Sequence, residues 1–130
     1  AETEAAKIYR NLLDQDLPEK TREKVESLVS QEEDHEEEFW SIIEDFYPQD
    51  EINLPESSGL SNPIEIDKGI TLEELFQIAI TSEKESEKFY KNLMDRFEEK
   101  EVRRTLGFLA ASEREHYEIL KEELKKLDLE

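Results

Sequence analysis

The sequence contains no cysteine among its 130 residues. Disulfides, thiolate catalysis, iron–sulfur clusters and zinc-finger or rubredoxin-type sites are therefore excluded for these residues. The sequence also lacks any apolar run near the roughly 20 residues that a membrane-spanning helix needs. We also expect no signal peptide, because the first residues lack the pattern of one. We therefore expect a soluble, cytoplasmic protein that has no membrane partner.

Basic residues are a minority, with 17 Lys and Arg against 36 Asp and Glu, so the formal net charge is −19. A surface this negative repels the phosphate backbone, which argues against nucleic acid as a partner. The same charge favours cations as ligands.

Glycine and proline are scarce, with 3 and 4 copies, and most of them fall between residues 47 and 70. That segment therefore reads as a long connection. Elsewhere the apolar residues recur with a helical period. They predict four helices, over about 1–14, 17–46, 71–97 and 98–127. We predict one all-α domain over residues 1–130, a four-helix bundle made of hairpin 1 (about 1–46), a crossover (about 47–70) and hairpin 2 (about 71–127).

Two of the predicted helices have recognisable start signals. Thr71 and Glu74 form a capping-box pattern at the start of the third helix. Asp16 is expected to cap the second helix, with Pro18 tolerated in its first turn.

The two hairpins align without a gap at an offset of 81 residues. The segment from Tyr9 to Asp14 matches the segment from Tyr90 to Asp95, and the match extends through both hairpins. The first helix is nevertheless about three turns shorter than its counterpart, the third. Either further residues precede it, or a partner chain covers that end of the bundle. We expect a homodimer, in which a helix swap is one possible arrangement.

The only two histidines of the chain each follow a glutamate by three positions, as Glu32 with His35 and as Glu113 with His116. Residues at i and i+3 share one helix face, and both pairs interrupt an apolar stripe where leucine is expected. Glutamate is frequent enough here to produce such pairs by chance. The repeated spacing and the coincidence with both stripes argue against chance.

Two further glutamates, Glu2 and Glu83, lie 30 positions before Glu32 and Glu113 respectively. They are expected on the inward faces of the first and third helices. Ionised carboxylates do not stay buried without partners. Two divalent metal ions would balance four carboxylates if the histidines are neutral. Carboxylate oxygen with imidazole nitrogen suits iron, manganese or zinc. Tyr9 and Tyr90 are either core tyrosines or hydrogen-bond partners of these carboxylates.

This arrangement resembles the ligand plan of the ferritin-like di-iron carboxylate proteins. The segments from Ala79 to Tyr90 and from Phe108 to His116 resemble their rubrerythrin branch. The resemblance implies a ferritin-like bundle that holds two iron ions. By this resemblance, Glu32 and Glu113 would be the bridging carboxylates, and Glu2 and Glu83 would be the terminal carboxylates. His35 and His116 would each bind one ion.

The same resemblance implies reduction of hydrogen peroxide or dioxygen. Because the 130 residues include no rubredoxin-like domain, electrons would come from a separate donor such as rubredoxin. Rubrerythrins carry an extra glutamate one turn beyond the ligand of the third helix, and here that position is Ser86. Two alternatives stay open: an iron-handling, ferroxidase-like protein without peroxidase turnover, and a bundle whose metal site serves folding and dimerisation.

Overall fold

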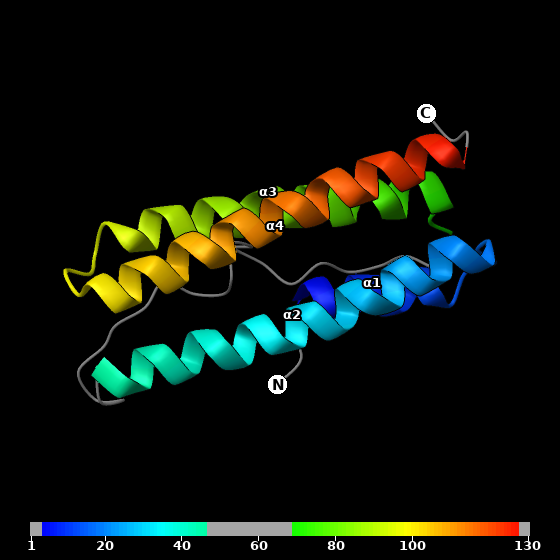
Figure 1. The fold of residues 1–130 in the computed structure, drawn as a ribbon. Helices are drawn as coiled ribbons and strands as arrows, with labels where there is room; N and C mark the ends of the chain where they lie inside the picture. Colours follow the sequence, from blue (N-terminus) through cyan, green and yellow to red (C-terminus); the bar gives the residue numbers. More distant parts are fainter. Residues whose placement is uncertain (1–3, 47–68, 128–130) are drawn as a thin grey trace.

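The computed structural model describes residues 4–46 and 69–127, which form four helices and no strand (Figure 1). These are α1 (Glu4–Leu13), α2 (Glu19–Phe46), α3 (Leu72–Met94) and α4 (Lys100–Lys126). The predicted all-α four-helix bundle is confirmed. No helix in this described part of the chain is both long and apolar enough to cross a membrane.

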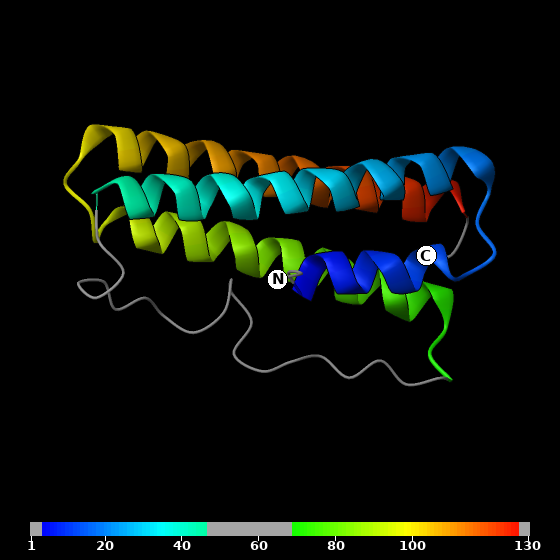
Figure 2. The same ribbon diagram turned by 90° about the horizontal axis from the view of Figure 1, so that it is seen from below.

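The helices pair as two hairpins, α1 with α2 and α3 with α4, and the hairpins pack through α1 against α3 and α2 against α4. The last turn of α2 and the first turn of α3 lie at opposite ends of the bundle in both views (Figures 1 and 2). The predicted crossover between them falls almost wholly outside the described residues. α1 runs beside α3 along only part of the length of the bundle (Figure 2).

The helix ends follow local chemistry more closely than the apolar pattern. The capping box of Thr71 and Glu74 is present, with both reciprocal hydrogen bonds at 3.1 Å. The expected first turn of α2 is wrong, because the helix begins at Glu19 and Pro18 precedes it. Its carbonyl accepts the backbone N–H of Arg22 at 2.9 Å, so Pro18 holds the capping position, where its missing N–H costs nothing.

The ends of α1 and α3 are closed by two arginines that are related by the repeat of 81 residues. Arg22 donates to the carbonyl of Leu13 at 2.8 Å, and Arg103 donates to the carbonyl of Met94 at 3.1 Å. These carbonyls are among those that a helix leaves unpaired at its C-terminus. The repeat therefore includes the turns as well as the helices. α3 ends at Met94, earlier than predicted. Phe97 lies in the loop between α3 and α4, and its side chain is buried.

Two apolar clusters fill the interior of the bundle. One lies around Tyr9, Leu28 and Leu120, and the other lies around Phe39 and Leu106. Along α4, residues up to Ala110 belong to the second cluster, and residues from Leu120 onward belong to the first. The turns between them carry polar side chains, and this polar layer contains the candidate site.

Candidate metal centre

Six buried polar or charged side chains form the layer between the two apolar clusters, coming from α2, α3 and α4. They are Glu32, His35, Glu83, Ser86, Glu113 and His116. Three of the four helices therefore contribute buried ionisable groups to one layer. Glu83 and Glu113 have no measurable exposure, at 0% each. Burial of charge without compensation is too costly to persist in a folded protein.

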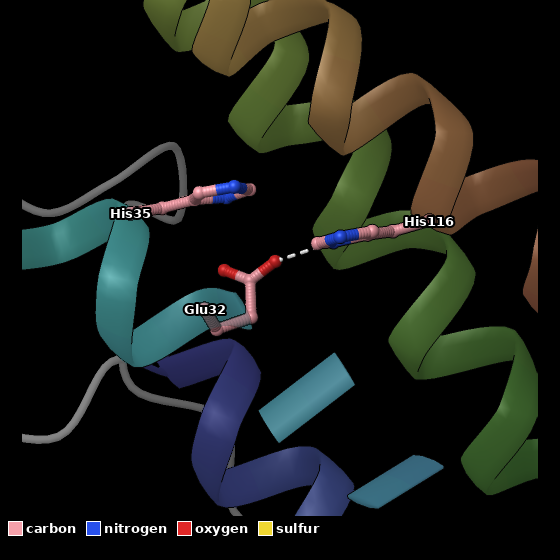
Figure 3. Close-up of side chains that lie close together, drawn as sticks. All are labelled: Glu32, His35 and His116. Carbon is pink, nitrogen blue, oxygen red and sulfur yellow. Dashed lines mark hydrogen bonds and ion pairs between the residues drawn. The ribbon is translucent and has the colours of Figure 1, made fainter. Parts of the chain in front are cut away.

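The two Glu-x-x-His pairs face each other across the bundle and exchange contacts. Nδ1 of His116 lies 2.8 Å from Oε1 of Glu32 (Figure 3). Nδ1 of His35 lies 3.2 Å from Oε1 of Glu113. The imidazole rings are stacked, with centroids 5.5 Å apart and planes 7° from parallel. Each histidine thus contacts the glutamate of the other pair. This reciprocal arrangement is the pseudo-two-fold symmetry that the sequence repeat predicts.

Glu83 enters the layer from α3 and is held by a tyrosine of α1. The hydroxyl of Tyr9 donates a hydrogen bond to Oε1 of Glu83, and Oε2 of Glu83 lies 3.6 Å from Nδ1 of His116. Tyr9 is fully buried. Burial and the charge of Glu83 raise the pKa of Tyr9 well above the ordinary value of 10.0. The phenol therefore keeps its proton and acts as a donor.

Burial dominates the electrostatics of the three carboxyls. It raises the pKa of Glu32 to about 7 and that of Glu113 to about 8, and it also raises the pKa of Glu83. Burial would lower the pKa of His116, but contacts with Glu32 and Glu83 outweigh it and raise that pKa to about 10. In the absence of a metal ion, these buried carboxyls and His116 therefore keep protons near pH 7 that the same groups would release if they were exposed to water.

The donor set fits metal ions. One ligand atom from each of Glu32, Glu83, Glu113 and His116 lies within 4.8 Å of the others, and His35 joins Glu32 and His116 in a second group of this kind. Oε2 of Glu83 and Oε2 of Glu113 are buried and have no hydrogen-bond partner among the described residues. Buried oxygens without partners are rare in folded proteins, and a coordinated cation would satisfy them. Oxygen and imidazole donors match iron, manganese and zinc.

The structure brings together five of the six predicted ligands. The sixth, Glu2, lies outside the described residues. Metal binding by these side chains stays a prediction. Tyr90 is buried, and its pKa is raised by burial and by the charges of Glu113 and Glu32. Both predicted tyrosines therefore lie near the carboxylates.

Two polar residues that contact buried groups escaped the sequence analysis, the exposed Gln31 and the buried Glu123. Gln31 places its amide oxygen 3.0 Å from Nε2 of His116. Glu123 is buried at 2% exposure and accepts hydrogen bonds from Thr21 at 2.9 Å and Lys24 at 2.8 Å, which join α2 to α4. Glu123 follows His116 and Leu120 on the apolar stripe of α4, so its position carried a signal. Gln31 carried none.

An all-α bundle with a buried layer of glutamate and histidine belongs to the class of four-helix metal-binding proteins. The family model for rubrerythrin matches residues 1–124. The chain is therefore a member of the rubrerythrin family, a ferritin-like di-iron carboxylate family. No curated protein and no solved structure gives a significant match.

Proposed function

We propose that this protein is a di-iron oxidoreductase that reduces hydrogen peroxide or dioxygen. The observation that carries the proposal is the buried layer itself, in which carboxylates and histidines converge and two carboxylate oxygens have no hydrogen-bond partner among the described residues. Membership of the rubrerythrin family supports iron as the metal. Manganese and zinc fit the same donor atoms.

Some side chains would bind both ions, and others would bind only one. By the family resemblance, Glu32 and Glu113 would be ligands common to both ions, and each lies beside the histidine of the other hairpin. His35 and His116 would each bind one ion, while Glu83 and its counterpart Glu2 would be terminal carboxylates. When bound, an iron pair supplies the electrons that reduction of an O–O bond requires.

The surrounding side chains would orient the ligands and handle protons. Tyr9 fixes one oxygen of Glu83 by donating its hydroxyl hydrogen, which leaves Oε2 directed into the layer. The apolar clusters on either side limit the access of water. Reduction of peroxide to two waters consumes two protons and two electrons. The electrons would be restored by a separate donor protein.

One observation favours the alternative of an iron-handling protein. Ser86 is buried in the layer at the position where the family resemblance implies an additional glutamate. A hydroxyl supplies no negative charge, so one carboxylate ligand of a peroxidase centre is missing from this turn. A ferroxidase-like protein that oxidises and transfers iron would not require it.

The two functions separate in a rapid-mixing experiment on protein loaded anaerobically with two Fe(II) per chain. A peroxidase should oxidise faster with hydrogen peroxide than with air-saturated buffer, and it should turn over repeatedly when a reductant is supplied. Equal rates with both oxidants, followed by release of Fe(III), would favour iron handling. The variant Glu113→Gln should lose iron, whereas the exposed neighbour variant Glu115→Gln should retain it. Iron well below two per chain in the wild type would refute the dinuclear site.

A further inference from the structure

The two histidines of the pseudo-symmetric layer differ in what holds their outer nitrogen. Nε2 of His116 lies 3.0 Å from Oε1 of Gln31. Among the described residues, no group makes the equivalent hydrogen bond to Nε2 of His35. The repeat explains the difference, because the residue 81 positions after Gln31 is Ser112, whose side chain is too short to act in the same way.

Gln31 is itself held in place on α2. Its amide nitrogen donates to Oγ of Ser27 at 3.0 Å, one helical turn earlier. The amide oxygen is thereby directed toward His116 on α4. Hydrogen bonds thus connect Ser27 to Gln31, Gln31 to His116, and His116 to Glu32 at 2.8 Å.

An imidazole binds a metal through the nitrogen that carries no proton, so its two tautomers are not equivalent as ligands. A hydrogen-bond acceptor at Nε2 keeps the proton there and leaves Nδ1 available on the side that faces the carboxylates. Such an outer partner also fixes the orientation of the ring. His116 has this support from Gln31. On its outer side, His35 contacts, among the described residues, the stacked ring of His116 and the edge of Phe108, whose centroid is 6.1 Å away.

We propose that Gln31 is a positioning residue for His116, so that the two metal positions are unequal and the one at His116 fills first. This inference rests on the proposed metal centre and adds an order of loading. Removal of an outer hydrogen-bond partner of a metal-binding histidine typically weakens metal affinity 10- to 100-fold. The first binding step should therefore weaken by about that factor in a variant that lacks the amide.

Zinc is a suitable probe because it is diamagnetic and binds the same donors. Calorimetric titration of the metal-free wild type should resolve a tight and a weaker step. Since the chain has only 2 histidines, nitrogen-detected NMR of the imidazoles should follow each one separately. The first equivalent of zinc should shift the His116 signals, and the second should shift those of His35.

Three variants test the role of the amide. Gln31→Ser, which installs the residue found at the counterpart position, should weaken the first step about 10- to 100-fold and make the two histidines fill together. Gln31→Glu keeps an acceptor at Nε2 and should restore the order of filling. Ser27→Ala removes the anchor of the amide but not its oxygen, so it should have a smaller effect than Gln31→Ser.

Failure of this inference is distinguishable from failure of the metal centre. Wild-type protein that binds no zinc, with both imidazoles unshifted, would overturn the centre and the inference together. Wild-type protein that binds two zinc ions, with the same order and affinity in Gln31→Ser, would overturn the role of Gln31 alone. A role limited to helix stability would leave the order of filling unchanged in all three variants, which would also refute the proposal.

Discussion

Replacing Glu113 with glutamine should have opposite effects on the metal-free and the metal-loaded protein. In the metal-free protein, burial and the neighbouring Glu83 raise the pKa of Glu113 from 4.5 to about 8. The carboxyl is therefore protonated in the folded state at pH 7 but ionised in the unfolded state. Glutamine has nearly the same shape and is neutral in both states.

The size of the effect follows from this pKa difference. Each pKa unit corresponds to about 1.4 kcal/mol, and pH 7 lies about 2.5 units above the unfolded value of 4.5. Taking up the proton on folding therefore costs about 3 kcal/mol at pH 7. Because the folded pKa is raised, the contribution of Glu113 to stability is fully present below about pH 4.5 and is lost as the pH rises to about 8. Metal-free Glu113→Gln should be about 3 kcal/mol more stable than wild type at pH 7, but less than 1 kcal/mol more stable at pH 5.

Metal should reverse this order. A ligand present at 1,000 times its dissociation constant stabilises the folded state by about 4.1 kcal/mol, which exceeds the gain of about 3 kcal/mol without metal. The variant lacks the negative charge and one of the two oxygens of this proposed ligand and should gain much less from metal. Urea unfolding followed by far-ultraviolet circular dichroism, with chelator or with excess zinc, measures both states. The exposed Glu115→Gln is the matched control and should change neither. A metal-free Glu113→Gln that is less stable than wild type at pH 7, or a gain that does not shrink at pH 5, would refute the reasoning.

Three further substitutions have defined outcomes. Gly107→Ala should stabilise the protein by about 1 kcal/mol in urea unfolding, because the added methyl would be 3.6 Å from its nearest neighbour, an ordinary contact distance. Tyr9→Phe removes a hydrogen bond to the buried carboxylate of Glu83. It should destabilise the metal-free protein by about 1–3 kcal/mol and weaken zinc binding about 10-fold in a chelator competition. Burial raises the pKa of Glu123, but hydrogen bonds from partners including Lys24 outweigh it and leave the pKa below 4.5. Its stabilisation is therefore present above pH 4.5 and is lost as the pH falls through the folded pKa. Glu123→Gln should cost about 1–2 kcal/mol at pH 7, and unfolding in acid should remove the difference.

The sequence predicted the bundle and its buried layer of glutamate and histidine because both depend on helix period. The spacing of three between Glu113 and His116, placed on a leucine stripe, is sufficient to direct both side chains into the interior. Features that depend on contacts between helices were not predicted. Gln31 reaches His116 only because α2 and α4 lie side by side, and the ion pair of Glu123 with Lys24 depends on the same contact.

Local turn chemistry accounts for the errors at the helix ends. The apolar pattern extended the third helix to Phe97, because that residue is buried and keeps the period. The helix nevertheless ends at Met94, where Arg103 donates hydrogen bonds to the carbonyls of Met94 and Phe97. Apolar spacing reports which side chains are buried, and it does not report which backbone groups are paired. At the start of α2, the start signals placed Pro18 in the first turn of the helix, whereas α2 begins one residue later, at Glu19.

The predicted ligands and the tyrosines Tyr9 and Tyr90 obey the repeat of 81 residues, whereas Gln31 and Glu123 do not. Gln31 corresponds to Ser112, and the buried Glu123 corresponds to Ile42. Because each histidine contacts the glutamate of the other hairpin, a substitution at a ligand position should disturb both metal positions.

A substitution at a support position should disturb only one of them. We therefore expect different zinc contents when both variants are loaded at the same high zinc concentration. Elemental analysis should show fewer than one zinc per chain in Glu113→Gln and two in Gln31→Ser. Equal losses in both variants would mean that the two ions are coupled through their supports as strongly as through their shared carboxylates.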